Sequence, residues 1–240
     1  MTKKILTSLA LASMVLFMNS CKKDEDDGPV EPSNYMVVHA AVGAPPVELY
    51  LDDVKASASA IAYGANSAYG SIAPKQYSVK LAAVNTINPV AETSVNMADG
   101  RSYSIFAYDT LLASKVKVFT VEDDLSAPAA GKAKVRFIHL SPNTSSTKIA
   151  VDLATNNTVL FPNRTYADVV TDGSKANFIS VDAGTYVVDV RIAGTTAPVP
   201  PILSVPGIVV EAGKIYTIVA KGILGRPGAN ALSAQLIVNK

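Results

Sequence analysis

Apolar and polar residues alternate along most of the chain after residue 34, the pattern of strands that bury one face. The clearest run is 185–192, where four apolar side chains share a face: Tyr186, Val188, Val190 and Ile192. Other short runs, rich in Val, Ile and Tyr and bounded by turn residues, are also predicted as strands: 35–41, 47–52, 76–84, 101–108, 115–121, 133–140, 147–153, 177–182, 214–221 and 233–239. None of these segments keeps the 3.6-residue period of a helix. The pattern therefore predicts an all-β chain of antiparallel sandwiches.

The same pattern occurs twice along the chain. The segment 36–39, followed by a pair of prolines, parallels the segment 136–139, which is followed by Ser141 and a proline. Further matches keep the same order at offsets of 100 to 113 residues: 47–52 with 148–152, 72–77 with 181–186 and 98–103 with 211–216. Matches in a constant order indicate duplication. We therefore expect two tandem immunoglobulin-like β-sandwich domains, 35–124 and 132–240, joined by the linker 125–131.

The first twenty residues are typical of a processing signal. Two lysines precede the apolar stretch 5–17, which is shorter than the ~20 residues that span a bilayer. The stretch ends at Ser20 and Cys21, a pairing that resembles the end of a bacterial lipoprotein signal. We therefore expect residues 1–20 to be a signal peptide and Cys21 to carry lipid, the alternative being an ordinary secretory leader with a chance cysteine.

Residues 21–34 are expected to form the lipidated end and a flexible tether, since charge, Pro and Gly dominate and little can be buried. The acidic run 24–27 directly follows two lysines. This arrangement resembles the export signal of Gram-negative lipoproteins that reach the outer cell surface. The predicted location is therefore the outer membrane, anchored by lipid and exposed at the cell surface.

Composition narrows the chemistry. The chain has 21 Lys and Arg against 20 Asp and Glu, so a nucleic-acid partner is not expected. One cysteine cannot form a disulfide within the chain or a thiolate zinc site. No phosphate-binding loop or dinucleotide fingerprint occurs, and no cofactor is expected.

The two histidines, His39 and His139, occupy matching positions in the repeat. The preferred interpretation is structural: each closes the first strand of its domain and hydrogen-bonds a neighbouring loop. The alternative is a hydrolase that uses His139 as base and Ser141 as nucleophile, with Asp152 nearby. The first copy has Ala41 where Ser141 stands, and no G-x-S-x-G motif is present. We therefore expect a protein that is not an enzyme.

Two binding features remain open. Tyr63 and Tyr69 fall in a loop rich in small residues that is expected to be exposed, so they are weak candidates for stacking on a sugar. Three consecutive acids near the end of the first domain are weak calcium candidates, with a solvated loop as the alternative: Glu122, Asp123 and Asp124. The proline-rich segment 195–206 is expected to be an edge or a loop.

The segments 135–142, 183–194 and 210–222 resemble a bacterial family of domains of unknown function. The resemblance covers nearly all of 132–222, and the first unit is a weaker copy. It implies tandem immunoglobulin-like sandwiches in secreted or lipid-anchored envelope proteins, and it implies no activity. The expected function is a non-enzymatic, surface-anchored binding or adhesion module for an envelope protein or a glycan. The alternative is a structural spacer of an envelope assembly.

Overall fold

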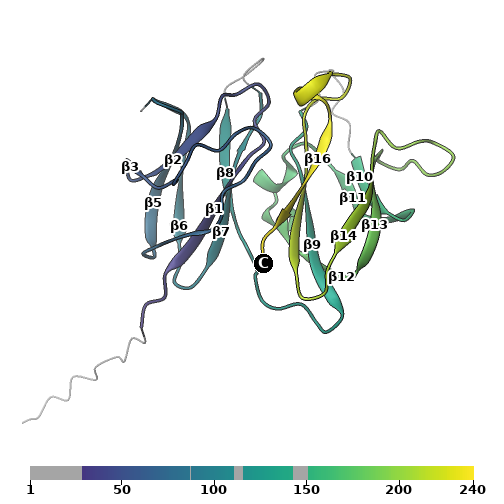
Figure 1. Cartoon of the computed structure of the whole chain (residues 1–240), viewed down its shortest axis with the longest axis horizontal. Helices are drawn as coiled ribbons and strands as arrows, with labels where there is room; N and C mark the ends of the chain where they lie inside the picture. The colour runs from purple at the N-terminus through teal and green to yellow at the C-terminus, as the bar shows by residue number, and fades with distance from the viewer. Residues whose placement is uncertain (1–28, 87, 111–115, 143–150) are drawn as a thin grey trace, which may run out of the picture.

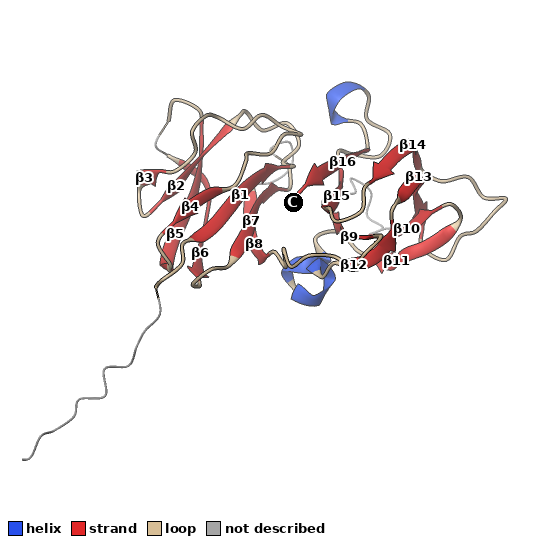
Figure 2. Ribbon diagram, turned by 60° about the horizontal axis from the view of Figure 1, so that its bottom comes forward, coloured by secondary structure: helices blue, strands red, loops and turns tan. Residues whose placement is uncertain are grey.

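The computed structural model describes residues 29–86, 88–110, 116–142 and 151–240. These residues form sixteen strands in four four-stranded sheets, and the helical structure among them is limited to three short 3₁₀ turns (Figures 1 and 2). The all-β prediction is confirmed, and the sheets form two sandwich-like units. The immunoglobulin-like character of each unit stays a prediction. Within the described ranges, no helix is long and apolar enough to cross a membrane.

The first unit contains the first eight strands: β1 (Ser33–His39), β2 (Val47–Leu51), β3 (Val54–Lys55), β4 (Gly70–Ile72), β5 (Lys75–Ala83), β6 (Pro89–Met97), β7 (Ser102–Tyr108) and β8 (Lys117–Glu122). One sheet has the order β4-β1-β7-β8, and the other has the order β3-β2-β5-β6. Strand β1 pairs in parallel with β7, with Val37 opposite Ile105, while the remaining pairs are antiparallel.

The second unit contains the other eight strands: β9 (Lys132–His139), β10 (Val151–Thr155), β11 (Thr158–Arg164), β12 (Ile179–Asp182), β13 (Gly184–Ile192), β14 (Leu203–Val210), β15 (Ile215–Lys221) and β16 (Ser233–Val238). The 3₁₀ turns are η1 (Asp168–Val170), η2 (Gly173–Ala176) and η3 (Gly228–Asn230). Its sheets have the orders β12-β9-β15-β16 and β11-β10-β13-β14. Adding eight to each strand number of the first unit therefore reproduces the order of the second, including the parallel pair β9–β15.

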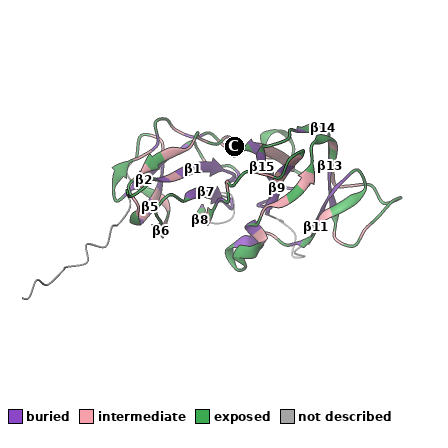
Figure 3. Cartoon of the chain, turned by 90° about the horizontal axis from the view of Figure 1, so that it is seen from below, coloured by how far each residue is buried: buried purple, intermediate pink, exposed green. Residues whose placement is uncertain are grey.

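Each unit has its own apolar core between its two sheets. Alternate residues point inward, so Leu49 and Val79 lie in the first core, and Leu153 and Val190 lie in the second. Figure 3 shows a third buried zone between the units, where the β1–β7 sheet faces the β9–β15 sheet. All four sheets are therefore stacked in layers.

The third core joins the units. It contains Met36, Val38 and Phe106 from the first unit and Ile138, Val219 and Ile237 from the second, all at most 1% exposed. Apolar burial of this kind stabilises by about 25 cal/mol per Å². The two sandwiches therefore pack face to face, because each unit presents an apolar outer sheet face to the other.

Candidate functional site

A groove of about 560 Å³ opens along one side of the first unit. One wall is the segment 56–62, which runs beside β2 beyond its short pairing with β3: Ile61 N donates to Val47 O at 2.7 Å. The other wall is the segment 65–70, which follows β1: Ser67 N donates to Val37 O at 2.9 Å. The groove therefore lies between the irregular edges of the two sheets of this sandwich.

The lining of the groove is small and uncharged. Most of the side chains are Ala or Ser, with Tyr35, Asn66 and Tyr69 as the larger polar contributors. Its volume falls in the range of roughly 300–1,000 Å³ that is typical of binding clefts. The second wall coincides with the tyrosine-bearing loop that the sequence predicts, whereas the first wall could not be predicted, because a run of Ala and Ser carries no motif.

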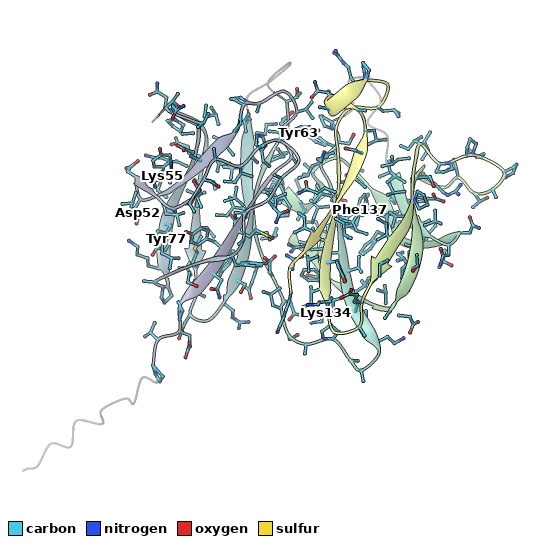
Figure 4. All side chains as sticks on the ribbon, in the orientation of Figure 1. Asp52, Lys55, Tyr63, Tyr77, Lys134 and Phe137 are labelled. Carbon is cyan, nitrogen blue, oxygen red and sulfur yellow. The ribbon has the colours of Figure 1, made fainter. Side chains whose placement is uncertain are left out.

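The two candidate tyrosines are half-buried at the boundary between the units, so the expectation that both are exposed is wrong. The ring of Tyr63 meets His39 edge-on at 6.0 Å, and the Lys221 Nζ lies 4.6 Å from its centroid. Figure 4 shows Tyr63 on the side of the first unit that faces the second. The Tyr69 hydroxyl donates to Asp123 Oδ2 at 2.5 Å. The Tyr63 ring is thus in contact with a histidine and a lysine, whereas Tyr69 also lines the groove.

Six side chains form a closed ring of hydrogen bonds in the interface between the units: Tyr69, Ser104, Asp123, Arg136, Thr217 and Asn239. On one side, Arg136 Nη2 lies 2.7 Å from Asp123 Oδ1 and donates to Ser104 Oγ at 3.0 Å. Ser104 Oγ in turn donates to Asp123 Oδ2 at 2.7 Å. This side of the ring links the carboxylate of the first unit to the guanidinium of the second.

The other side of the ring runs through the second unit. Arg136 Nε donates to Thr217 Oγ1 at 2.8 Å, and Thr217 Oγ1 donates to Asn239 Oδ1 at 2.7 Å. Asn239 Nδ2 donates to the Tyr69 hydroxyl at 3.1 Å, which closes the ring. Every hydroxyl in the ring both accepts and donates. Burial, followed by the charge of Asp123, raises the pKa of Tyr69, so this phenol keeps its proton.

The ion pair at the centre of the ring is fully shielded from water. The side chains of Arg136 and Asp123 are both 0% exposed. The guanidinium carbon also lies 4.5 Å from the centroid of the Phe178 ring and 5.9 Å from that of Phe106. Charges desolvated to this degree are tolerated only when they are paired and hydrogen-bonded. The ring therefore joins the two units in one fixed relative position.

The three acids that are weak calcium candidates have different partners in the structure. Asp123 belongs to the buried ion pair. Asp124 pairs with Lys134 at 2.7 Å, and the Lys134 and Ser126 side chains lower the pKa of its carboxyl to about 2. Glu122 lies 3.4 Å from Arg101. Each carboxylate thus has a cation from the protein, and the described residues contain no group of three potential metal ligands.

His39 has the surroundings of a structural histidine. Its Nε2 lies 3.0 Å from Pro45 O, and its Nδ1 accepts from Ala41 N at 3.3 Å. A neutral ring with the proton on Nε2 satisfies both contacts. Burial lowers the pKa of His39 and favours this neutral form.

His139 differs from its counterpart. It is 2% exposed, and neither ring nitrogen has a hydrogen-bond partner among the residues that the structure describes. Ser141 Oγ instead donates to Gly222 O at 2.7 Å. Asp152 accepts from the backbone N–H groups of Asn163 and Gly194. The structure therefore does not assemble the His139–Ser141 pair that the hydrolase alternative requires.

Exchanging the two tyrosines for phenylalanine tests the ring. Tyr69→Phe is expected to lower the free energy of unfolding by about 1–3 kcal/mol, because Asn239 and Asp123 each lose a buried partner. Tyr63→Phe is the matched control and should cost nothing, since the Tyr63 hydroxyl has no partner within the described ranges. Urea denaturation of both variants measures the difference, and equal losses would contradict the role of the ring.

Residues 33–150 match a family model described as a domain of unknown function, DUF4397. This match covers the unit that the sequence analysis treats as the weaker copy and continues into the start of the second unit. It includes both Asp123 and Arg136. Cys21 lies outside the described residues, and the structure says nothing about its state.

No curated protein matches the chain. Among solved structures, one titled "The Bacillus anthracis TIE protein" is 11% identical with a TM-score of 0.22, a similarity too distant to carry an argument. The alignment covers 81% of this chain and 34% of that one, so the chain spans about a third of its length. Over the first unit and the beginning of the second, the chain is thus similar to a family whose function is unknown.

Proposed function

We propose that this chain is a non-enzymatic binding protein of the cell envelope, held at the outer membrane by lipid on Cys21 and exposed at the cell surface. Its ligand is a protein or a glycan of the envelope. The basis is the signal-like N-terminus together with a rigid pair of β-sandwiches. The observation that carries the proposal is the position of the N-terminal segment on this body.

The N-terminal segment is fixed at one end of the first unit. Glu31 N donates to Asp99 Oδ1 at 2.6 Å, and Gly100 N donates to Glu31 O at 3.2 Å. Ser33 Oγ donates to Ala98 O at 2.6 Å. These contacts hold residues 31–33 against the tight turn between β6 and β7, at the lower end of the first unit in Figure 1.

Two of the described loops lie at the opposite end. Strands β1 and β15 both run away from the attachment end, and the loops 40–46 and 222–232 follow them. Figure 1 shows the loop with η3, in yellow, at this far end, while the loop 193–202 projects from the outer side of the second unit. A protein tethered through residues 22–30 would therefore direct its loops away from the membrane, as binding proteins built on sandwiches do.

The spacer alternative receives less support. Face-to-face stacking makes the body two sandwiches wide, whereas a spacer gains length from domains joined end to end. The hydrolase alternative would need His139 and Ser141 in contact, and Ser141 donates elsewhere.

Replacement of Cys21 tests the anchor. Cys21→Ser is expected to move the protein from the membrane fraction to the soluble fraction, because the acyl chains that hold it are lost. The control Asn19→Ala keeps the cysteine and should remain with the membrane. Mass spectrometry of the exported wild-type protein should find Cys21 acylated, and an unmodified cysteine would overturn the anchor.

Binding is tested with the full-length protein in detergent. Purified envelope proteins and a glycan array are the probes, and saturable binding of a member of either class supports the proposal. Binding to neither class, combined with protection of the protein from protease added to intact cells, would contradict it.

A further inference from the structure

A small pocket opens on the outer face of the β3-β2-β5-β6 sheet, the face that points away from the second unit. Its volume is about 310 Å³, and four residues line it: Tyr50, Asp53, Lys80 and Ala82. Tyr50 lies opposite Lys80 on the paired strands β2 and β5, and Ala82, which is 1% exposed, forms the floor. Figure 4 shows Lys55, the partner of Tyr50 on β3, on this outer side. The volume lies at the lower end of the range of roughly 300–1,000 Å³ for ligand pockets.

The lining combines an aromatic wall with an ion pair, and contacts within the protein hold both in place. The hydroxyl of the half-buried Tyr50 donates to Glu48 Oε2 at 3.2 Å, and Glu48 Oε1 lies 2.6 Å from Lys55 Nζ. Lys80 Nζ donates to Asp53 Oδ1 at 2.6 Å. The ring and the ion pair are therefore positioned before a ligand arrives, which lowers the entropic cost of binding.

The backbone beneath the pocket is fully paired. Tyr50 lies opposite Lys55 of β3 on one side and opposite Lys80 of β5 on the other, and Lys80 lies opposite Glu92 of β6. Strand addition needs a free sheet edge, which an interior position of the sheet does not provide. A ligand of this pocket is therefore recognised by side chains and not by main-chain pairing.

The ion pair leaves the pocket without net charge. Lys80 and Asp53 are the charged residues of the lining, and the hydrogen bond to Asp53 raises the pKa of Lys80, so the ammonium keeps its charge. Their contact uses one of three N–H donors and one of two carboxylate oxygens, and the Asp53 side chain is 77% exposed. The pair thus offers donors and acceptors to a polar ligand without favouring an anion or a cation.

The second unit folds without this lining. In β10 the residue after the core leucine is Ala154, whereas in β2 it is Tyr50. Ala154 lies opposite Asp189, which is 6% exposed and accepts from Arg191 Nη2 at 2.9 Å and from Ser204 Oγ at 2.7 Å. The polar groups on this face of the second unit therefore bind one another. The fold does not require an aromatic ring here, and the first unit has one beside an exposed ion pair.

We propose that this pocket binds a neutral sugar residue of a glycan, which stacks on the Tyr50 ring and hydrogen-bonds to Asp53 and Lys80. The proposal rests on the binding function proposed above and names the glycan as its ligand class. A pyranose presents an apolar face of C–H groups and a rim of hydroxyl groups, which match an aromatic wall and a charged pair. The site differs from the loop 63–69 that the sequence suggests for sugar binding.

Replacement of Tyr50 tests the stacking. The probe is an array of oligosaccharides that end in neutral hexoses or N-acetylhexosamines, applied to the full-length protein in a detergent without a sugar headgroup. Tyr50→Ala, which copies the second unit, should weaken binding of a selected glycan by about tenfold or more, whereas Tyr50→Phe keeps the ring and should stay within about threefold. Equal binding by the wild type and Tyr50→Ala, or binding that requires a charged sugar, would overturn the proposal.

Replacement of Asp53 tests the polar half of the pocket. Asp53 has a φ of 65°, a conformation that Asn also adopts, so Asp53→Asn should fold and weaken glycan binding by about threefold or more. The matched control is Asp182→Asn, since Asp182 also lies 2.6 Å from a lysine and its side chain is 76% exposed. It should bind as the wild type does, and equal affinities of the two variants would overturn the role of Asp53.

A measurement on the wild type does not depend on the folding of a variant. Acetylation of lysines, read by mass spectrometry, should slow at Lys80 when the selected glycan binds and stay unchanged at Lys132, and equal modification of Lys80 would overturn the proposal. If no neutral glycan binds, the inference is wrong, but saturable binding of an envelope protein would leave the proposed function intact. Glycan binding that Tyr50→Ala does not weaken would likewise place the ligand elsewhere on the protein.

Discussion

Asp123→Ala is expected to lower the free energy of unfolding by about 3–5 kcal/mol, because it leaves the Arg136 guanidinium buried and unpaired between the two sandwiches. Both side chains are 0% exposed, so water cannot replace the lost carboxylate. The Tyr69 and Ser104 hydroxyls lose their acceptor in the same step. Urea denaturation followed by circular dichroism measures the loss, with the midpoint and slope read separately.

The matched control is an exposed ion pair of similar length. Lys132 and Asp182 lie 2.6 Å apart with side chains that are 41% and 76% exposed, so Asp182→Ala should change stability little. The double variant Asp123→Leu with Arg136→Met should recover part of the loss, since it removes both charges and keeps the volume. If Asp123→Ala unfolds at the urea concentration of the wild type, the ring does not stabilise the interface.

His139 should make the protein sensitive to acid. Burial, offset in part by Asp168 and reinforced by Arg164, lowers the pKa of His139 to about 4 from 6.5. Between about pH 4 and pH 6.5, the His139 side chain therefore binds a proton in the unfolded chain but not in the folded protein. The preference of the folded protein for neutral His139 costs no stability above pH 6.5, and it lowers the free energy of unfolding as the pH falls from 6.5 through 4. The loss is about 3 kcal/mol at 1.36 kcal/mol per pKa unit.

His139→Phe should flatten this dependence. The imidazole already stacks on Phe137 at 6.2 Å with an interplanar angle of 13°, so a second phenyl ring fits the same packing. The expected result is similar stability at pH 7 and a smaller decrease between pH 6.5 and 4, measured by urea denaturation across this range. His39→Phe is the control and should lose stability at pH 7, because two hydrogen bonds disappear. If the free energy of unfolding of His139→Phe decreases between pH 6.5 and 4 as much as that of the wild type, another group causes the acid sensitivity.

Much of the strand content could be predicted from local alternation. The run 185–192 lies within β13, and the run 133–140 coincides with β9 to within a residue at each end. The predictions succeeded for strands with one face buried and the other exposed to solvent, because apolar and polar residues then alternate along the sequence of the strand itself. The burial of both faces in β1 and β9 was not expected, because it depends on packing against the other unit.

The strands that the pattern missed are short, irregular or interrupted by proline. β3 and β4 contain two and three residues, too few for alternation to register. β14 contains Pro206, and its pairing with β13 shifts register between Tyr186 and Val188. It is an edge strand, the position where a missing N–H is tolerated, as the proline-rich segment 195–206 suggested. β6 begins at Pro89, also on an edge.

The interface ring could not be predicted, because its members are scattered from Tyr69 to Asn239. One local signal existed: Arg136 interrupts an apolar strand at the repeat position that Met36 occupies in the first unit. A charged residue there implies a buried partner, but only the fold shows that the partner is Asp123. The groove could not be predicted for a related reason: a run of small side chains leaves a groove only where the fold places that run between the edges of two sheets.

The shared core between the units has a consequence for how such a chain can change. A deletion that removed one sandwich would leave an apolar surface exposed to water, with Phe106 and Val38 on the first unit or Ile138 and Val219 on the second. Neither sandwich can stand alone with its apolar sheet face covered, so recombination that adds or exchanges a single sandwich would yield a protein that aggregates. We therefore expect the two repeats to be gained or lost together rather than one at a time.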